Sequence, residues 1–197
     1  TILLLIITNK IDYTSNLLIV LLSFLGFGLI GFIDDFLSLR KKGNEGLTTY
    51  QKLFMQVIIS VIFFYIYMKN GGQTSLTIGT LHIDLELGWL YGLFILFVLV
   101  ASSNAVNLTD GLDGLAGGLS AIAYIAFALI SLIVGYEEIG IFSLILSGSI
   151  LGFLVFNSYP AKVIMGDTGS LALGGAMGAI AIITHRELTL VVVAGVF

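Results

Sequence analysis

The chain of 197 residues has no cysteine, one proline and one tryptophan, and only 10% of its residues are charged. The absence of cysteine excludes disulfides, thiolate nucleophiles and iron–sulfur centres, and it leaves the redox compartment undetermined. Soluble domains carry about 25% charged residues, so this composition excludes an ordinary soluble domain. The formal net charge of −4 is small and argues against a nucleic-acid partner.

Apolar sequence is what the chain has in abundance, with 58% hydrophobic residues and a mean hydropathy of +1.10. Runs of about 20 apolar residues, long enough to cross a bilayer as helices, recur throughout. They predict an all-α, polytopic transmembrane bundle that forms a single integral membrane domain over residues 1–197. Both ends lie inside apolar runs, which favours the central part of a longer protein. The expected spans lie near residues 17–33, 53–68, 89–106, 117–134, 139–156, 171–184 and 188–197, and residues 2–7 are expected to end an earlier span.

The segment 75–87 differs from the spans because apolar and polar residues alternate around Gly79. This alternation predicts a short extramembrane β-hairpin. Counting spans places five aspartates on the face opposite this hairpin: Asp34, Asp35, Asp110, Asp113 and Asp167. Arg40, Lys41, Lys42, Lys52 and Lys162 share the aspartate face, whereas Lys10, Lys69 and Arg186 lie on the other. The positive-inside bias therefore predicts that the aspartate face is cytoplasmic.

Carboxylates near hydrocarbon cost roughly 2.5–3.5 kcal/mol each at mid-bilayer, so their accumulation beside lysines predicts a site for a metal ion and a phosphorylated substrate. The first expected loop covers residues 34–52, and in it Asp34 and Asp35 precede a basic cluster. One carboxylate would handle a proton or a metal, while Lys42 or Lys52 neutralises phosphate. The simpler alternative is a pair of helix-end charges beside ordinary membrane anchors.

The second loop, residues 104–118, reads NAVNLTDGLDGLAGG. Asp110 and Asp113 are three residues apart, so they share a face if the segment is helical. Thr109 or Asp110 would cap the following helix, and Gly111 would let a ligand approach the backbone. The alternative is a capped, glycine-rich turn without chemistry.

The third loop, residues 156–170, reads FNSYPAKVIMGDTGS. Pro160 is expected to stop the preceding helix. Asp167 lies where a glycine-flanked helix N-terminus would offer an anion site, and it would hold Mg²⁺ against a diphosphate. The alternative is that Asp167 is a simple N-cap.

Taken together, IDDF with RKKGNEGLTTYQK, then NAVNLTDGLDGLAGG, then FNSYPAKVIMGDTGSLALGG closely resemble the polyprenyl-phosphate N-acetylhexosamine-1-phosphate transferases. The match is ordered along nearly the whole chain, and the two long strings are highly specific. The resemblance implies a ten-helix enzyme of the bacterial cytoplasmic (inner) membrane, with a cytoplasmic active site and a periplasmic hairpin. Its partners would be a UDP-sugar, undecaprenyl phosphate and the bilayer, and whether it forms a homodimer stays open.

The second and third loops are most similar to those family members that transfer phospho-N-acetylmuramoyl-pentapeptide from UDP to undecaprenyl phosphate. This Mg²⁺-dependent reaction gives lipid I and UMP in peptidoglycan synthesis. The resemblance implies that Asp34 and Asp35 are the catalytic pair and that Asp167 is both catalytic and the Mg²⁺ ligand. It implies substrate-binding roles for Lys42, Lys52, Asn107, Asp110, Gly111, Leu112, Asp113 and Asn157.

Two departures from the family pattern stand out. Ile164 occupies a position where some relatives place an aromatic residue that stacks on uracil. The family's proline-and-glycine motif and its histidine triad are absent from this stretch, and we expect them outside it. The nearest alternative function is transfer of GlcNAc-1-phosphate to the same lipid. A more distant alternative is an ion-coupled transporter, which would place acidic residues within the spans.

Overall fold

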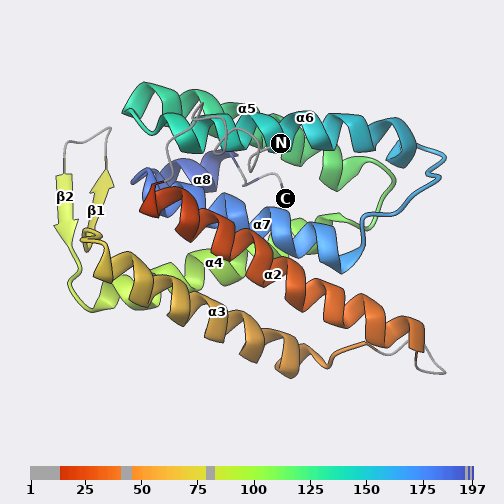
Figure 1. Ribbon diagram of the computed structural model, residues 1–197, viewed down its shortest axis with the longest axis horizontal. Helices are drawn as coiled ribbons and strands as arrows, with labels where there is room; N and C mark the ends of the chain where they lie inside the picture. The colour runs from red at the N-terminus through yellow and green to blue at the C-terminus, as the bar shows by residue number, and fades with distance from the viewer. Residues whose placement is uncertain (1–13, 41–45, 79–82, 194, 196) are drawn as a thin grey trace.

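The computed structural model describes residues 14–40, 46–78, 83–193, 195 and 197, and in these ranges it is a helical bundle with one small sheet (Figure 1). The helices and strands are α2 (Ser15–Arg40), α3 (Thr49–Lys69), β1 (Ser75–Ile78), β2 (Ile83–Glu86), α4 (Leu90–Thr109), α5 (Leu115–Val134), α6 (Glu137–Asn157), α7 (Gly166–Ile183) and α8 (Glu187–Val193).

The six helices α2 to α7 are long and apolar enough to cross a membrane, which confirms the predicted polytopic helical bundle. Strands β1 and β2 pair antiparallel, as predicted for residues 75–87. Figure 1 shows this hairpin at the left end of the bundle, whereas the C-terminal end of α2 and the N-terminal ends of α3 and α7 lie toward the right. The segments that carry the candidate residues therefore gather at the end opposite the hairpin.

Helix α2 continues past its apolar run to Arg40, so the prediction that a loop begins at Asp34 is wrong. No glycine or proline interrupts the segment, and Arg40 lies in the last turn, where a positive charge favours the helix dipole. Helix α3 likewise begins early, at a capping box in which the Gln51 N–H donates to Thr48 Oγ1 (3.3 Å) and the Thr48 N–H donates to Gln51 Oε1 (3.0 Å). Lys52 therefore lies in the first turn of α3.

Within the second loop only residues 110–114 form a turn, because α4 continues to Thr109 and α5 begins at Leu115. The predicted side-chain cap on α5 is also wrong. The N-cap is Gly114, whose φ of 75° lies in the left-handed region that glycine favours, and no side chain caps the helix. The Thr109 hydroxyl instead donates back to the Ala105 carbonyl at 2.9 Å. Asp110 and Asp113 therefore do not share a helical face.

Helix α7 is the central element of the bundle. Every residue from Ser170 to Ile183 is buried, and Figure 1 shows α7 between α2 and the α5–α6 pair. It packs chiefly against α2 and α4. Glycine and alanine dominate its sequence, and small residues allow close approach of helices in lipid. A Cβ at Gly31 of α2 would overlap the backbone of Asp167, so this glycine lets α2 reach the start of α7.

We expect Gly31→Ala in the full-length protein to lower the unfolding temperature measured by scanning fluorimetry. The added methyl would push α2 away from α7, and overpacking of this kind costs about 1–3 kcal/mol. Gly148→Ala on α6 is the matched control, because a Cβ there meets nothing within 4 Å. An equal unfolding temperature for both variants would contradict the close packing of α2 on α7.

Candidate active site

Three acidic side chains converge at the end of the bundle opposite the hairpin. Asp34 and Asp35 lie near the C-terminal end of α2, and Asp167 lies in the first turn of α7. One oxygen from each carboxylate lies within 4.8 Å of the other two. All three residues are half-buried, which strengthens the mutual repulsion of their charges relative to open water. Such a cluster requires cations or hydrogen-bond donors around it.

Lys52 on α3 connects two of these carboxylates. Its Nζ lies 3.3 Å from Asp34 Oδ2 and forms an ion pair and a hydrogen bond with Asp167 Oδ2. The three side chains are only 13–23% exposed, so solvent screens this arrangement less than a surface salt bridge. The Leu47 N–H donates to Asp34 Oδ1 at 2.6 Å and fixes the other oxygen of that carboxylate.

Asp35 holds the N-terminus of α7. Its Oδ1 accepts the Asp167 N–H at 3.2 Å, and its Oδ2 accepts the Thr168 N–H at 2.9 Å and the Thr168 hydroxyl at 2.6 Å. The first amides of a helix have no partner within the helix, and the dipole there favours negative charge. Gly166 has a φ of 67°, and a Cβ there would lie 2.9 Å from Asp35 Oδ2. Glycine at 166 is therefore part of this contact.

Asn107 on α4 completes the surroundings of Asp167. Its Nδ2 donates to Asp167 Oδ1 at 2.8 Å and to Ser170 Oγ at 2.9 Å. Asp167 consequently accepts from α3 through one oxygen and from α4 through the other. The position of this carboxylate depends on both helices.

Asp110 lies beside the cluster, in the turn after α4. Burial raises the pKa of Asp110, and the negative charges of Asp167 and Asp35 raise it further, while a hydrogen bond from the Gly166 backbone opposes them. The pKa of Asp110 therefore depends on the negative charge of the acidic cluster.

Two other predicted residues brace loops instead of joining the cluster. Asn157 is 4% exposed; its Oδ1 accepts the Gly114 N–H at 3.1 Å, and its Nδ2 donates to the Val163 carbonyl at 2.9 Å. The exposed Asp113 accepts the Ala161 N–H at 2.9 Å. Both side chains therefore join the α4–α5 turn to the α6–α7 connection.

Other residues named from the sequence are exposed or lie outside the described residues. Gly111 and Leu112 are exposed in the α4–α5 turn, and Ile164 is 77% exposed in the α6–α7 connection. Lys42 lies outside the described residues. The substrate-binding roles predicted for Lys42, Gly111 and Leu112 stay predictions.

Several groups at the site were not predicted from the sequence. Thr168 and Ser170 follow Asp167 within one helical turn, and that run of polar residues at a helix start was the signal that could have identified them. The Leu47 amide carries no such signal, because it acts through the backbone. Gln56 on α3 pairs with Asn104 on α4, and no pattern of neighbouring residues in the sequence predicts a contact between two helices.

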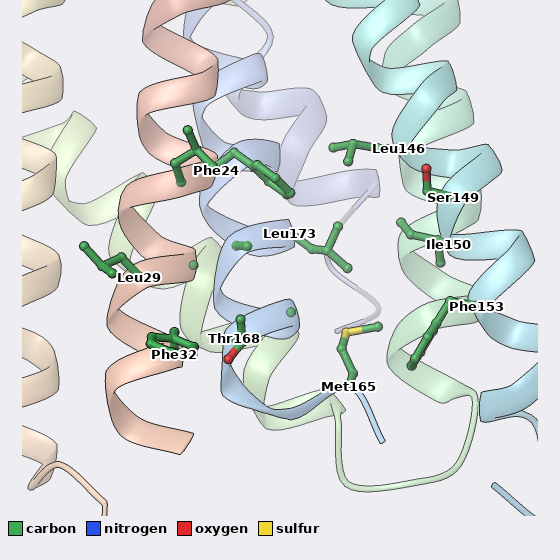
Figure 2. A pocket seen from close by; sticks show the side chains of 14 residues that line it. Phe24, Leu29, Phe32, Leu146, Ser149, Ile150, Phe153, Met165, Thr168 and Leu173 are labelled. Atoms are coloured by element: carbon green, nitrogen blue, oxygen red, sulfur yellow. The ribbon is translucent and has the colours of Figure 1, made fainter. Parts of the chain in front are cut away.

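An apolar groove of about 650 Å³ opens between α2, α6 and α7 (Figure 2). Phe24 and Phe32 line it from α2, and Phe153 lines it from α6. Its polar side chains are Ser149 and Thr168, and the Thr168 hydroxyl is bound to Asp35. This lining does not suit a charged nucleotide, so the polar chemistry belongs to the acidic cluster beyond Thr168.

Comparison with known families matches residues 17–185 to the family described as glycosyl transferase family 4. Three curated proteins that the chain matches are phospho-N-acetylmuramoyl-pentapeptide-transferases. The one from Halalkalibacterium halodurans is 50% identical over 186 residues, covering 94% of this chain and 57% of that protein. The one from Geobacillus thermodenitrificans is 49% identical over 173 residues, covering 88% of this chain and 53% of that protein. The one from Bacillus pumilus is 48% identical over 198 residues, covering 100% of this chain and 61% of that protein. The chain thus spans between half and two thirds of the length of these relatives.

We expect Asn157→Leu to lower the unfolding temperature and to expose the loops around residues 110–114 and 158–165 to limited proteolysis. The substitution leaves the Gly114 N–H and the Val163 carbonyl unpaired, and such a loss costs about 1–3 kcal/mol. Ser158→Ala is the control, because within the described residues that exposed hydroxyl bonds to the Leu154 carbonyl of its own helix and to no loop. Unchanged cleavage and stability in Asn157→Leu would show that this amide does not brace the loops.

Proposed function

Because the chain belongs to glycosyl transferase family 4, we propose that it carries the catalytic centre of a phospho-N-acetylmuramoyl-pentapeptide-transferase. Such an enzyme moves phospho-N-acetylmuramoyl-pentapeptide from its UDP carrier to undecaprenyl phosphate and yields lipid I and UMP. The chain is a multi-pass membrane protein. In the proposal it lies in the bacterial cytoplasmic membrane, with the acidic cluster on the cytoplasmic face.

The observation that carries the proposal is the meeting of Asp34, Lys52 and Asp167 from three separate helices. Phosphoryl transfer depends mainly on positioning and charge neutralisation, and it needs little covalent chemistry from the protein. A cluster at one end of a membrane bundle is accessible to a soluble nucleotide and to a lipid whose tail stays in the bilayer. In the proposal, the nucleotide approaches the acidic cluster from water and the lipid phosphate approaches it from the bilayer.

The donor set suits Mg²⁺. This hard cation prefers oxygen ligands and usually binds one or two carboxylates together with substrate phosphates. The carboxylates of Asp34, Asp35 and Asp167 meet within 4.8 Å, and among the described residues the ammonium of Lys52 pairs with two of them and does not balance three negative charges. Asp167 would hold the ion, with Asp34 and Asp35 within reach. When bound, Mg²⁺ supplies charge neutralisation on the diphosphate and on the leaving UMP.

The hydrogen bonds support different roles for the two adjacent aspartates. Both oxygens of Asp35 are engaged by the start of α7, so Asp35 orients Asp167 and Thr168. Asp34 instead shares its Oδ2 with the flexible side chain of Lys52. Asp34 is thus the better candidate to accept the proton of the acceptor phosphate or to orient it.

In the proposed reaction, an oxygen of the lipid phosphate attacks the phosphorus that carries the sugar. The bond between that phosphorus and the bridging oxygen breaks, and the electron pair leaves with UMP. Lys52, freed from one carboxylate by a small movement, offsets the negative charge of the phosphates.

The alternatives have less support. Transfer of GlcNAc-1-phosphate would use the same aspartates, but the relatives that match the chain at 48–50% identity bear the muramoyl-pentapeptide name. Supplying the intact protein with each UDP-sugar in turn separates these two activities. A transporter would place acidic residues midway through its spans, whereas in the described spans they lie near the helix ends.

We expect Asp167→Asn in the full-length protein to lower the rate of UMP release about 10²–10³-fold and to raise the Mg²⁺ concentration needed for half-maximal rate. The reason is the loss of a charged ligand that contributes several kcal/mol of charge stabilisation. Glu86→Gln, on the exposed hairpin at the opposite end, should leave both quantities unchanged. Near-normal turnover with unaltered Mg²⁺ dependence would overturn the metal assignment.

Asp34→Asn and Asp35→Asn should separate chemistry from positioning. Asp34→Asn is expected to lower kcat about 10²–10⁴-fold, because it removes a catalytic base. The unfolding temperature should change little, because the amide oxygen still accepts the Leu47 N–H and the loss of the Lys52 ion pair is offset by weaker repulsion within the cluster. Asp35→Asn should lower the unfolding temperature as well, because the charged partner of the α7 amides is lost. Equal effects of the two substitutions on stability and rate would refute the division of roles.

A further inference from the structure

A reciprocal pair of side-chain amides joins α3 to α4 on the membrane side of the acidic cluster. Asn104 Nδ2 donates to Gln56 Oε1 at 2.8 Å, and Gln56 Nε2 donates to Asn104 Oδ1 at 3.4 Å. Asn104 Nδ2 also donates to the Val100 carbonyl of its own helix at 2.8 Å. Gln56 is 1% exposed and Asn104 is half-buried, so this is a partly buried polar contact within two candidate spans.

The spacing of the pair relates it to the active site. Gln56 lies four residues after Lys52 on α3, and Asn104 lies three residues before Asn107 on α4. Residues three or four apart share one face of a helix, so each amide lies about one turn deeper than the donor that reaches Asp167. The pair therefore joins α3 to α4 next to the level where both helices bind one carboxylate.

Apolar packing alone does not set the separation of α3 and α4. Figure 1 shows α3 and α4 close together at the hairpin end and diverging toward the other end. Near the hairpin, a Cβ at Gly92 of α4 would lie 3.0 Å from the Phe64 ring of α3, so the helices are in tight contact. Toward the site, an apolar groove of about 410 Å³ opens between them, and Asn104 is one of its lining residues. The long Gln56 side chain spans the gap where the helices diverge.

The hydrogen bonds between Gln56 and Asn104 are expected to add little to the free energy of unfolding. Buried amides require partners, and interhelical hydrogen bonds within membranes contribute little net stability. A matched pair of apolar side chains would fill the same space without that requirement. What the amides add is a directional contact of defined length, which apolar side chains lack.

We propose that Gln56 and Asn104 are positioning residues that keep Lys52 and Asn107 simultaneously on Asp167. The proposal rests on the function proposed above for its catalytic consequence, but its structural consequence is measurable without activity. Loss of the pair lets α3 and α4 separate at the site, so one of the two donors leaves the carboxylate. A displacement of about 1 Å can cost about a hundredfold in rate, so the effect on kcat is measurable.

The experiment uses the full-length protein, free of other cysteines, with spin labels at Tyr50→Cys on α3 and Leu108→Cys on α4. These positions are 85% and 81% exposed and contact no residue of the cluster through the bonds described above. We expect Gln56→Leu to broaden the label-to-label distance distribution measured by double electron–electron resonance. We also expect kcat for UMP release to fall about tenfold or more, with a smaller change in KM for the UDP-sugar.

Two further variants keep the test decisive. The exchange variant Gln56→Asn with Asn104→Gln retains one long and one short amide and should recover part of both the narrow distance and the rate. If Gln56→Leu fails to fold, the apolar pair Gln56→Met with Asn104→Leu leaves no amide unpaired and should fold, yet it should show the broad distance and the low kcat.

The control for a merely structural role is Ser23→Ala. It removes a buried interhelical hydrogen bond, from the Ser23 hydroxyl to the Gly175 carbonyl (2.8 Å), that joins α2 to α7. Its unfolding temperature should fall, while kcat per folded enzyme and the α3–α4 distance stay unchanged. A Gln56→Leu variant that behaves like Ser23→Ala would overturn the proposal. If the unsubstituted protein releases no UMP, the proposed function fails, and the distance measurement still decides whether the pair holds the helices.

Discussion

The site depends on the contact between the carboxylate of Asp35 and the first amides of α7. That contact requires α2 and α7 to approach until their backbones nearly touch, which Gly31 permits, and Gly166 leaves room for the Asp35 carboxylate. A negative charge at a helix N-terminus satisfies amides that have no partner within the helix. Asp167 is carried on the same turn, so this contact also fixes where the proposed metal ligand lies.

Charge balance explains why the cluster is tolerated at the edge of a membrane. Three carboxylates form the cluster, and Lys52 offsets part of their charge by bridging Asp34 and Asp167. Backbone and amide N–H groups satisfy further oxygens, since Leu47 donates to Asp34 and Asn107 donates to Asp167. The remaining negative charge is what a divalent cation and a polyanionic substrate would complete in the proposed reaction.

Some helices fix the position of the acidic cluster, and others supply the groups that contact its carboxylates. Helix α7 is buried from Ser170 to Ile183 and presents Asp167 from its half-buried first turn, while α3 and α4 each contribute one donor to that carboxylate. Groups that touch no substrate in the proposal still set the geometry, as do Gln56 and Asn104 between the helices and Asn157 between the loops. Catalysis in such a site would be sensitive to substitutions one turn away from the reacting groups.

The sequence by itself determined the membrane helices, the hairpin and the position of five aspartates at one end of the bundle. The helices follow from apolar runs, the hairpin from alternating apolar and polar residues, and the shared end from counting the spans. The sequence motifs also pointed to Lys52, Asn107 and Asp167. Only the tertiary structure decided that Asp34 and Asp35 lie on a helix, that Asp35 binds the start of α7, and that the exposed Asp113 braces loops. Local patterns report how each segment meets lipid or water, whereas the partner of a carboxylate depends on how distant helices pack, and a backbone donor has no side-chain signature.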